Sequence, residues 1–255
     1  MGARMGMLLF GPFALKFDYV SLSITMKTRF LSAFLLASVL LPAAALAAPC
    51  STTTDKAASS STPLMYSSRT GDAENVRCLL DAGAEVNVAN GAGVTALMFA
   101  AAPGHTDIVQ QLIDKGAQVN VAGPKGLTAL MLAAHKGYTD TARLLIARGA
   151  QVNAADDSGY TALMLAAGQG RTDTVRMLIE QGAQVNAAVA KGKESADVTA
   201  LMSAAADGHA DTVRLLIEKG ADVNATDKNG VTALDIAQAE GHTAIVEMLR
   251  AAGAK

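Results

Sequence analysis

The chain contains four histidines, whose side chains could ligate a metal ion or transfer protons near neutral pH. They are His105, His135, His209 and His242. His105, His209 and His242 each directly follow a glycine, and they occupy the same position in a sequence unit that repeats along the chain. Other copies of this unit carry tyrosine or arginine at that position. Equivalent positions in neighbouring units should lie about 10 Å apart, which is too far for two imidazoles to share one ion. We therefore expect no metal site and explain these histidines by their repeat position.

A column of methionines could supply other chemistry, because thioethers bind soft metals such as Cu(I) and react with oxidants. The column consists of Met65, Met98, Met131, Met164 and Met202. Thioethers one copy apart cannot ligate a single ion together, and methionine also fills irregular gaps between packed helices. We expect a packing role, with protection of a periplasmic redox enzyme against oxidative stress as the alternative.

The stretch GAGVTA at residues 91–96 fits the glycine-rich pattern of a dinucleotide-binding turn. The equivalent six residues of the next two repeat units are PKGLTA and DSGYTA, so the match is a consequence of the repeat and not of a nucleotide site. The sequence contains no G-x-S-x-G, H-E-x-x-H or P-loop motif and no cysteine pair at metal-ligand spacing. We expect neither an enzyme nor a cofactor.

These residues belong to a repeated unit that begins near the tripeptide Thr-Ala-Leu. The threonines are Thr95, Thr128, Thr161, Thr199 and Thr232, at intervals of 33, 33, 38 and 33 residues, and one period earlier stands Thr62. Within a unit, apolar residues recur at helical spacing over 162–167 and again over 175–179, and each run precedes a glycine. Each helix offers too small an apolar face for a core of its own, so neighbouring units must stack.

Each unit reads approximately T-A-L-M-x-A-A-x-x-G-H-x-D-x-V-x-x-L-I-x-x-G-A-x-V-N-A, and this pattern closely resembles the ankyrin repeat. Methionine stands where that family often has histidine. The resemblance covers residues 62–255 and implies an all-α repeat solenoid. Six stacked helix-turn-helix units would start near residues 62, 95, 128, 161, 199 and 232, with projecting β-hairpin fingers between them. It also implies a non-catalytic scaffold that binds proteins through the finger tips and the concave face of the first helices.

Partner-binding residues are mapped from this resemblance onto the fingers and the inner face. The residue before each threonine gives an apolar column of Val94, Leu127, Tyr160, Val198 and Val231. An exposed apolar stripe is what the centre of an interface needs. The polar rim expected around it consists of Lys125, His135, Lys136, Asp157, Ser158 and Gln169. Structural support of the fingers is the alternative role for each of these residues.

The finger before Thr199 is five residues longer than the others, because thirteen residues separate Asn186 from Thr199 where eight separate Asn153 from Thr161. Its charged residues are Lys191, Lys193, Glu194 and Asp197. Insertions in a solenoid are tolerated where they leave the stacking intact, and that edge often binds partners. We assign the four residues to partner contact, with neutral drift of a loop as the alternative.

Residues 26–47 have the three regions of a secretory signal peptide. Lys27 and Arg29 precede an uncharged apolar run over 30–41, and Ala45-Leu46-Ala47 fits the cleavage rule. We expect an exported bacterial protein, periplasmic or secreted, whose mature chain begins at Ala48 after cleavage behind Ala47. An uncleaved anchor is the alternative, because the uncharged run nearly reaches the ~20 residues of a membrane span.

The segments around this signal have simpler interpretations. Residues 1–25 are interpreted as an upstream extension from a mis-assigned start. Residues 48–61 are interpreted as a disordered Ser/Thr-rich tether. Cys50 stands where a lipidated cysteine would, although Pro49 before it does not fit a lipobox. In an oxidising compartment Cys50 and Cys78 could also pair, and the sequence leaves open whether they do or whether Cys78 is a half-buried free thiol.

The charge balance bears on the partner. Residues 1–47 hold four of the 21 basic and one of the 23 acidic residues, so the mature chain has 17 basic and 22 acidic residues and a net charge of −5. That surface argues against nucleic acid. We expect a monomer that binds an unidentified protein and does not insert into a membrane after signal cleavage. A secreted effector acting on host proteins is a further alternative.

Overall fold

The computed structural model describes residues 50–52, 61–188 and 197–255. These residues belong to one compact unit, Cys50–Lys255. The expected extension and signal peptide lie outside the described residues, as do Lys191, Lys193 and Glu194 of the long finger. No helix among the described residues is both long enough and apolar enough to span a lipid bilayer.

Twelve α-helices and one 3-10 helix make up the regular structure of the described residues. The helices are α2 (Pro63–Thr70), α3 (Ala73–Asp81), α4 (Ala96–Ala101), α5 (Thr106–Asp114), η1 (Pro124–Gly126), α6 (Ala129–Lys136), α7 (Thr139–Ala147), α8 (Ala162–Gly168), α9 (Thr172–Glu180), α10 (Ala200–Ala206), α11 (Ala210–Glu218), α12 (Ala233–Ala239) and α13 (Thr243–Ala251).

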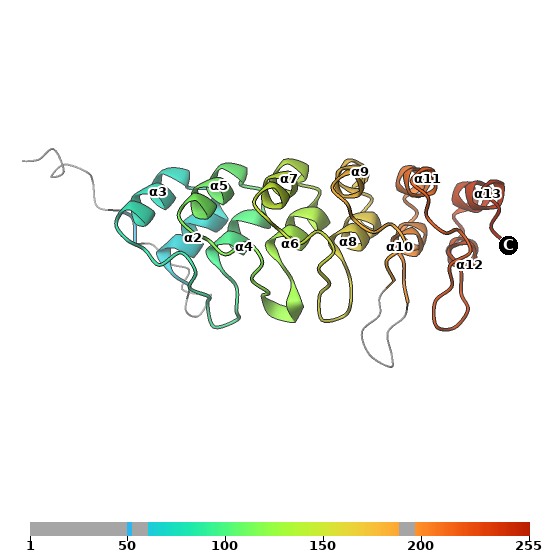
Figure 1. Cartoon of the computed structure of the whole chain (residues 1–255), viewed down its shortest axis with the longest axis horizontal. Helices are drawn as coiled ribbons and strands as arrows, with labels where there is room; N and C mark the ends of the chain where they lie inside the picture. The colour runs from blue at the N-terminus through green and yellow to red at the C-terminus, as the bar shows by residue number, and fades with distance from the viewer. Residues whose placement is uncertain (1–49, 53–60, 189–196) are drawn as a thin grey trace, which may run out of the picture. The chain divides into compact units, whose positions relative to one another are not determined.

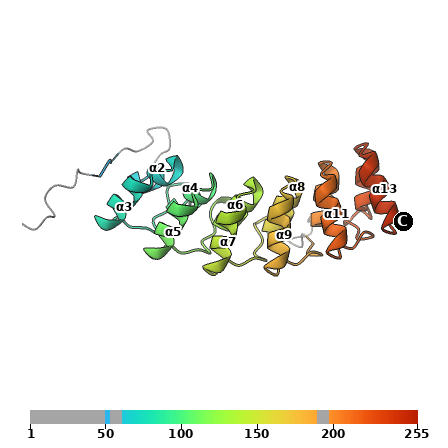
Figure 2. The same ribbon diagram turned by 90° about the horizontal axis from the view of Figure 1, so that it is seen from above.

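The α-helices form consecutive pairs, each with a first helix (α2, α4, α6, α8, α10 or α12) and a second helix (α3, α5, α7, α9, α11 or α13). The two helices of a pair pack against each other, and each first helix also packs against the first helix of the next pair. The second helices follow one another in a parallel row (Figures 1 and 2). The all-helical stack expected from the repeat is therefore present in the described residues.

The repeated threonine begins each first helix. Its hydroxyl accepts a hydrogen bond from the backbone N–H three residues later, as Thr95 does from Met98 at 3.4 Å. The same cap is present in all six first helices. It satisfies one of the N–H groups that a helix start leaves without an intrahelical partner. The Thr-Ala-Leu tripeptide thus encodes the beginning of each first helix.

Between the stacked first helices the core contains alanines, leucines and methionines, and the second helices contribute buried valine, leucine and isoleucine side chains. Ala133 and Ala134 are completely buried, and small side chains of this kind let neighbouring helices approach closely. Every methionine of the column from Met65 to Met202 is at most 2% exposed. The burial agrees with the packing role expected for these residues, and the column offers no exposed thioether to an oxidant.

An asparagine of each unit ties that unit to the next. These asparagines are Asn87, Asn120, Asn153, Asn186 and Asn224. The amide of Asn153 is typical: its Nδ2 donates to the carbonyl of Gly182 at 3.0 Å, and its Oδ1 accepts the N–H of Gln184 at 2.9 Å. One amide side chain therefore satisfies a donor and an acceptor beside the end of the following second helix.

Histidines after the interhelical glycines also connect units. Nε2 of His209 lies 3.0 Å from the carbonyl oxygen of Gly168, and Nε2 of His242 lies 3.1 Å from that of Ala206. Nε2 of His105 lies 3.3 Å from the carbonyl oxygen of Arg69. Each imidazole ring therefore lies within hydrogen-bond distance of a carbonyl near the C-terminal end of the first helix in the preceding unit. Carbonyls at a helix end lack intrahelical partners. This geometry gives the repeated histidines a structural role.

The loops that join the helix pairs differ from the predicted β-hairpin fingers. The described residues contain no strand, and three loops have one isolated antiparallel bridge each: Ala89–Thr95, Ala155–Thr161 and Thr226–Thr232. In the second of them, Oδ1 of Asp156 accepts the N–H groups of Ser158 and Tyr160, both at 2.9 Å. The turn takes up the residues between Ala155 and Thr161, and α8 begins directly after Thr161, so a longer ladder has no room on either side of the bridge.

Cys50 and Cys78 form a disulfide, with their Cα atoms 5.6 Å apart. Beside it, the N–H of Ser51 donates to Oδ1 of Asn75 at 2.8 Å, and Nδ2 of Asn75 donates to the Ser51 carbonyl at 3.1 Å. The start of the expected tether is therefore fixed to α3. Cys50 and Ser51 therefore differ from the disorder expected for the tether, because a covalent bond and two hydrogen bonds hold them in place; residues 48, 49 and 53–60 of the expected tether lie outside the described residues.

Candidate protein-binding surface

A hollow of about 370 Å³ lies on the face formed by the first helices and the loops, next to α8, α10 and α12. Its apolar lining includes Tyr160, Leu165, Val198 and Ile236, all half-buried. Polar groups come from His135, Gln169 and Asp207. The hollow thus combines a partly exposed apolar centre with a few polar side chains, the composition expected of a recognition site.

Two small residues account for the position of this hollow. Ser203 of α10 stands where other first helices carry an aromatic or aliphatic side chain, and Gly168 at the end of α8 faces it. A Cβ atom added to Gly168 would lie 3.5 Å from Cβ of Ser203. The two positions therefore face each other at a distance that short side chains can bridge, and the space that the larger fifth residue fills in the other first helices stays open beside Ser203.

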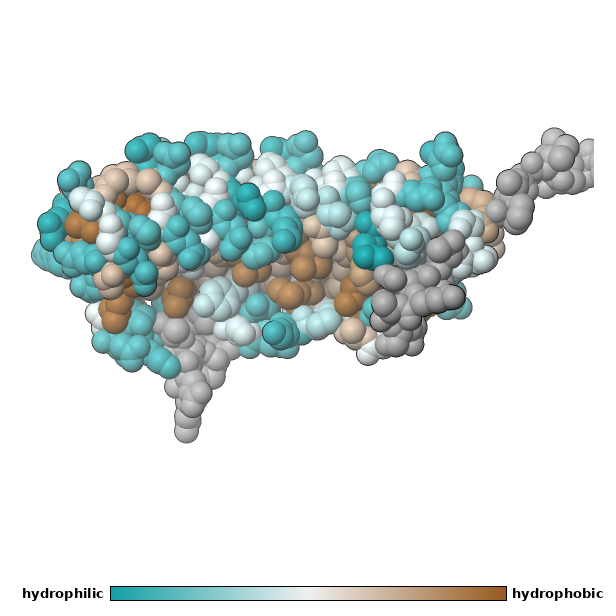
Figure 3. All heavy atoms as spheres, turned by 180° about the vertical axis from the view of Figure 1, so that it is seen from behind, coloured by the Kyte–Doolittle hydropathy of each residue, from teal (hydrophilic) through white to brown (hydrophobic). Residues whose placement is uncertain are grey.

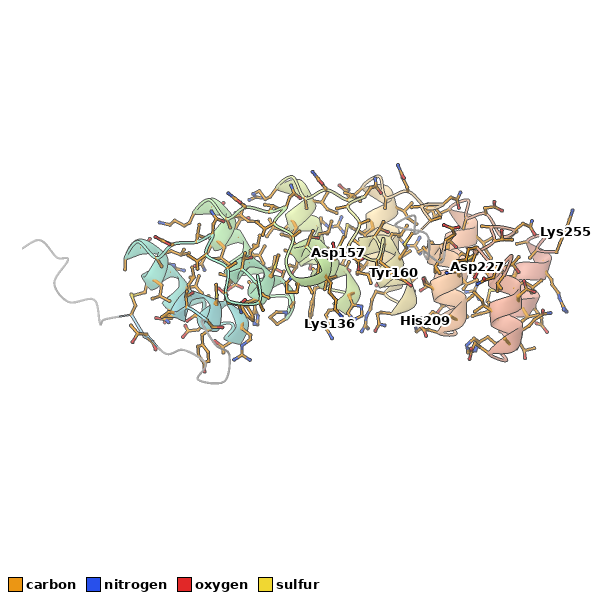
Figure 4. The ribbon with its side chains drawn as sticks, turned by 90° about the horizontal axis from the view of Figure 1, so that it is seen from below. Lys136, Asp157, Tyr160, His209, Asp227 and Lys255 are labelled. Atoms are coloured by element: carbon orange, nitrogen blue, oxygen red, sulfur yellow. A yellow bond between two sulfur atoms is a disulfide. The ribbon has the colours of Figure 1, made fainter. Side chains whose placement is uncertain are left out.

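The structure brings some of the predicted partner-binding residues together in the hollow and places the others outside it. His135, Tyr160, Gln169 and Val198 line the hollow together. The others lie elsewhere: Lys136 is exposed at the end of α6, Lys125, Asp157 and Ser158 are exposed on loops, and Leu127 and Asp197 are half-buried. Viewed from below, Tyr160 lies between Asp157 on the loop side and Lys136 and His209 on the side of the helix ends (Figure 4).

A second apolar column was missed by the sequence reasoning. It is the fifth residue of each Thr-Ala-Leu-Met-x motif: Phe99, Leu132, Leu165 and Ile236, with Ser203 in α10. All five are half-buried, whereas the residues on both sides of them in the motif are buried in α4, α6, α8 and α10. The signal was available, because in the four inner units x is the one place in T-A-L-M-x-A-A where the residue type changes. A place that packing does not restrict is a surface position.

The apolar side chains extend beyond the hollow. Half-buried apolar residues pack against the core along the whole row, from Val94 and Phe99 to Val198 and Ile236. On the face opposite to that of Figure 1, apolar surface forms a band between the helices and the loops (Figure 3). Extended apolar surface with a polar border is typical of a protein-interaction site.

Two neighbouring loop tips are fastened to each other near this surface. The carbonyl of Lys125 accepts the N–H of Asp157 at 2.9 Å. Lys125 has a left-handed backbone (φ 58°), and Gly123 stands where the other loops have Asn90 or Asp156. Without a side-chain acceptor at Gly123, this loop closes as a short 3-10 turn, which directs the Lys125 carbonyl at its neighbour.

The charges around the hollow differ between its two sides. Burial lowers the pKa of His135, and the neighbouring cations Lys136 and Arg171 lower it further, so the imidazole is neutral at neutral pH. On the other side, Asp207 lines the hollow and Asp235 lies in the first turn of α12. Hydrogen bonds from the N–H and the hydroxyl of Thr232 hold the pKa of Asp235 below its usual range, so this carboxyl is ionised.

The lining of the hollow includes the aliphatic hydroxyl of Ser203. The hydroxyl of Ser203 donates to the backbone carbonyl of Thr199 at 3.2 Å, so it is not paired with a base. Within residues 50–52, 61–188 and 197–255 there is no group of three His, Cys, Asp or Glu side chains that could hold a metal ion. What the surface offers is shape, apolar contact and a distribution of charge.

Comparison with known families agrees with this geometry. A family model for ankyrin repeats in three copies matches residues 36–123, 121–189 and 188–255, and its first match begins within the predicted signal peptide. No curated protein matches the chain. Ankyrin repeats generally mediate protein–protein interaction and are typically non-enzymatic. Because the matches span most of the sequence, the chain belongs to the ankyrin-repeat family.

Proposed function

We propose that this chain is a non-catalytic scaffold that binds a protein partner through the face of its first helices and the adjoining loop tips. The observation that carries the proposal is the hollow of about 370 Å³ with Tyr160, Leu165, Val198 and Ile236 in its lining. A half-exposed apolar pocket beside neutral and charged polar groups can seat one large side chain of a partner.

The rigidity of the surrounding units supports this role. Capping threonines, interunit asparagines and histidines hold the first helices and loops in one arrangement before a partner arrives. A surface that is already ordered loses less conformational entropy on binding, so more of the contact energy appears as affinity. In this proposal the helix pairs correspond to six ankyrin units, and the single-bridge loops correspond to their fingers.

The direct test is capture of the partner with matched substitutions. Leu165→Ala shortens an apolar side chain at the hollow, and Leu144→Ala shortens a half-buried leucine on second helix α7. We expect Leu165→Ala to weaken binding of the captured protein by about 2 kcal/mol, roughly thirtyfold, as at an interface hot spot. Leu144→Ala should bind like the wild type.

Both variants must be shown to be folded by circular dichroism before binding is compared by surface plasmon resonance. If the two substitutions weaken binding equally, or if only Leu144→Ala does so, the first-helix face is not the binding surface. A surface that captures no protein from any cellular fraction would contradict the scaffold function itself.

We also propose export to the periplasm or the cell exterior. The signal-like sequence of residues 26–47 supports this location. The disulfide between Cys50 and Cys78 supports it too, because such bonds persist in oxidising compartments and are rare in the cytosol. The accumulated protein should begin at Ala48 when its intact mass is measured. A mass that includes residues 26–47 in the cell-envelope fraction would contradict cleavage.

The alternatives have less support. Protection of a redox enzyme through the methionine column requires accessible thioethers, and these methionines are at most 2% exposed. No feature of the described residues favours a role as a host-directed effector.

A further inference from the structure

One position at the C-terminal end of the first helices changes its charge along the row. The eighth residue after the capping threonine is Lys136 at the end of α6, Gln169 after α8, Asp207 after α10 and Glu240 after α12. All four are exposed. The series therefore runs from positive through neutral to negative across the units that surround the hollow.

Nearby charges reinforce the two ends of this series. Arg171 lies close enough to His135 to lower its pKa together with Lys136, which places two cations on the α6 side. On the other side, α12 carries ionised Asp235 in its first turn and is followed by Glu240.

The loop tips that the structure describes carry both signs and do not reverse this order. Lys125 and Asp157 lie on neighbouring tips joined by a backbone hydrogen bond, and Asp227 is followed by Lys228. Among the described residues, the difference in charge between the two sides of the hollow therefore comes from the ends of the first helices.

The dimensions suit a short extended peptide. Neighbouring units lie about 10 Å apart, so Lys136 and Asp207 are separated by roughly 20 Å and Lys136 and Glu240 by roughly 30 Å. An extended chain advances about 3.3 Å per residue, so a segment of about nine residues covers the whole series. The hollow lies between the two charged ends and is apolar at its centre.

We propose that the partner presents an extended segment that is acidic at one end, apolar in the middle and basic at the other. The acidic end lies over Lys136, the apolar side chain enters the hollow beside Tyr160 and Leu165, and the basic end lies over Asp207 and Glu240. This inference rests on the proposed scaffold function and specifies the chemistry of its partner. Complementary charges fix the register of such a segment and reject segments of one sign.

The test uses four labelled peptides with one central phenylalanine: EESGFGSKK, its reverse KKSGFGSEE, acidic EESGFGSEE and basic KKSGFGSKK. Binding to the full chain, purified in the form that the cell accumulates, is measured by fluorescence anisotropy at low salt. We expect one of the two mixed peptides to bind at least about threefold more tightly than both single-sign peptides, the size of effect that exposed charge pairs produce. Raising the salt concentration should reduce this preference.

Charge-swap variants test the order directly. Lys136→Glu makes both ends acidic and should shift the preference to the basic peptide, whereas Asp207→Lys should shift it to the acidic peptide. Arg143→Glu in α7 and Glu180→Lys in α9 are matched controls, because they change the same charges at exposed positions of second helices. The controls should keep the preference of the wild type.

The remaining outcomes each overturn the inference. If the basic peptide binds at least as tightly as both mixed peptides, the net charge governs binding and the order does not. If no peptide binds, or if a second copy of the chain occupies this face by analytical ultracentrifugation, the proposed segment is wrong. In those cases, a captured partner whose binding is weakened by Leu165→Ala would still support the scaffold function. A captured partner whose binding is unchanged by Leu165→Ala would contradict both the scaffold function through this face and the proposed segment.

Discussion

Single residues in this protein act in two ways, according to whether they follow the repeat or depart from it. Residues that follow it, such as the capping threonines, have the same bonds in every unit. Departures change the surface: Ser203 and Gly168 open a hollow, and Gly123 reshapes a loop tip. Functional differences between units are therefore expected at departures, because the shared residues are already engaged in packing and capping.

Asp235 is a departure with a consequence for acid stability. It replaces the repeated methionine and accepts the N–H and the hydroxyl of Thr232 at 2.9 and 2.7 Å. These bonds lower its pKa in the folded state. Stabilisation from a lowered carboxyl pKa is complete above the unfolded value of about 4 and is lost as the pH falls through the folded value.

The Asp235→Asn variant tests this effect. Asparagine keeps an oxygen acceptor for the cap but does not titrate. The free energy of unfolding of the variant should therefore fall less than that of the wild type between about pH 5 and about pH 2.5. Urea unfolding at several pH values measures both. Equal losses in the two proteins would show that the Asp235 carboxylate does not contribute.

At the scale of elements, contacts between equivalent places of neighbouring units hold the stack together. The side chain after each interhelical glycine covers the glycine of the preceding unit, as His242 covers Gly208. Both Gly208 (φ 75°) and Gly241 (φ 77°) have a left-handed backbone. A Cβ atom added to Gly208 would meet the His242 ring, whereas one added to Gly241 would have no neighbour within 4 Å. Alanine at Gly241 would therefore cause backbone strain alone, whereas alanine at Gly208 would cause the same strain and also disturb the packing of the His242 ring.

Alanine at these two glycines should destabilise the protein unequally. Both substitutions cost about 1–2 kcal/mol because alanine disfavours a left-handed backbone. Gly208→Ala should cost about 1 kcal/mol more, since its Cβ would lie 2.7 Å from the His242 ring and disturb the bond of that ring to Ala206. Chemical denaturation compares the two variants. Equal losses would mean that the histidine contact adds nothing to interunit stability.

At the scale of the whole described unit, stability is expected to depend on contacts between neighbours and on the disulfide at one end. Each helix pair packs chiefly on the pairs next to it. In such an array a terminal pair has one neighbour instead of two and opens first. The bond between Cys50 and Cys78 constrains this terminal pair, because it joins the segment before α2 to α3.

Removal of the disulfide should destabilise α2 and α3 first. The cysteines are 28 residues apart, and closure of a loop of this size restricts the unfolded chain by about 3–4 kcal/mol. The Cys50→Ser, Cys78→Ser double variant should lose hydrogen-exchange protection in α2 and α3 while α8 to α13 keep theirs. A reducing agent should have the same effect on the wild type and none on the variant. Uniform loss along the whole array would contradict independent opening of the terminal pair.

Much of the fold follows from the sequence alone, because the repeat spacing specifies where each helix begins and which residues it buries. The same pattern brought His135, Tyr160, Gln169 and Val198 into consideration, and these residues share one hollow. The sequence reasoning missed Leu165, Ile236 and Asp207, because a column compares one position across units and does not say which positions of neighbouring units share a hollow. A hollow depends on what several units place side by side.

The sequence by itself determined the family, the repeat period and the two helices of each unit, because these depend on local spacing within about 33 residues. Only the tertiary structure decided that Cys50 and Cys78 form a disulfide and that three loops have a single bridge each. It also decided that Gly168 of one unit faces Ser203 of the next. The physical reason is the same in each case. These distances depend on how the units stack and how the chain turns between them, and no pattern within one unit records that geometry.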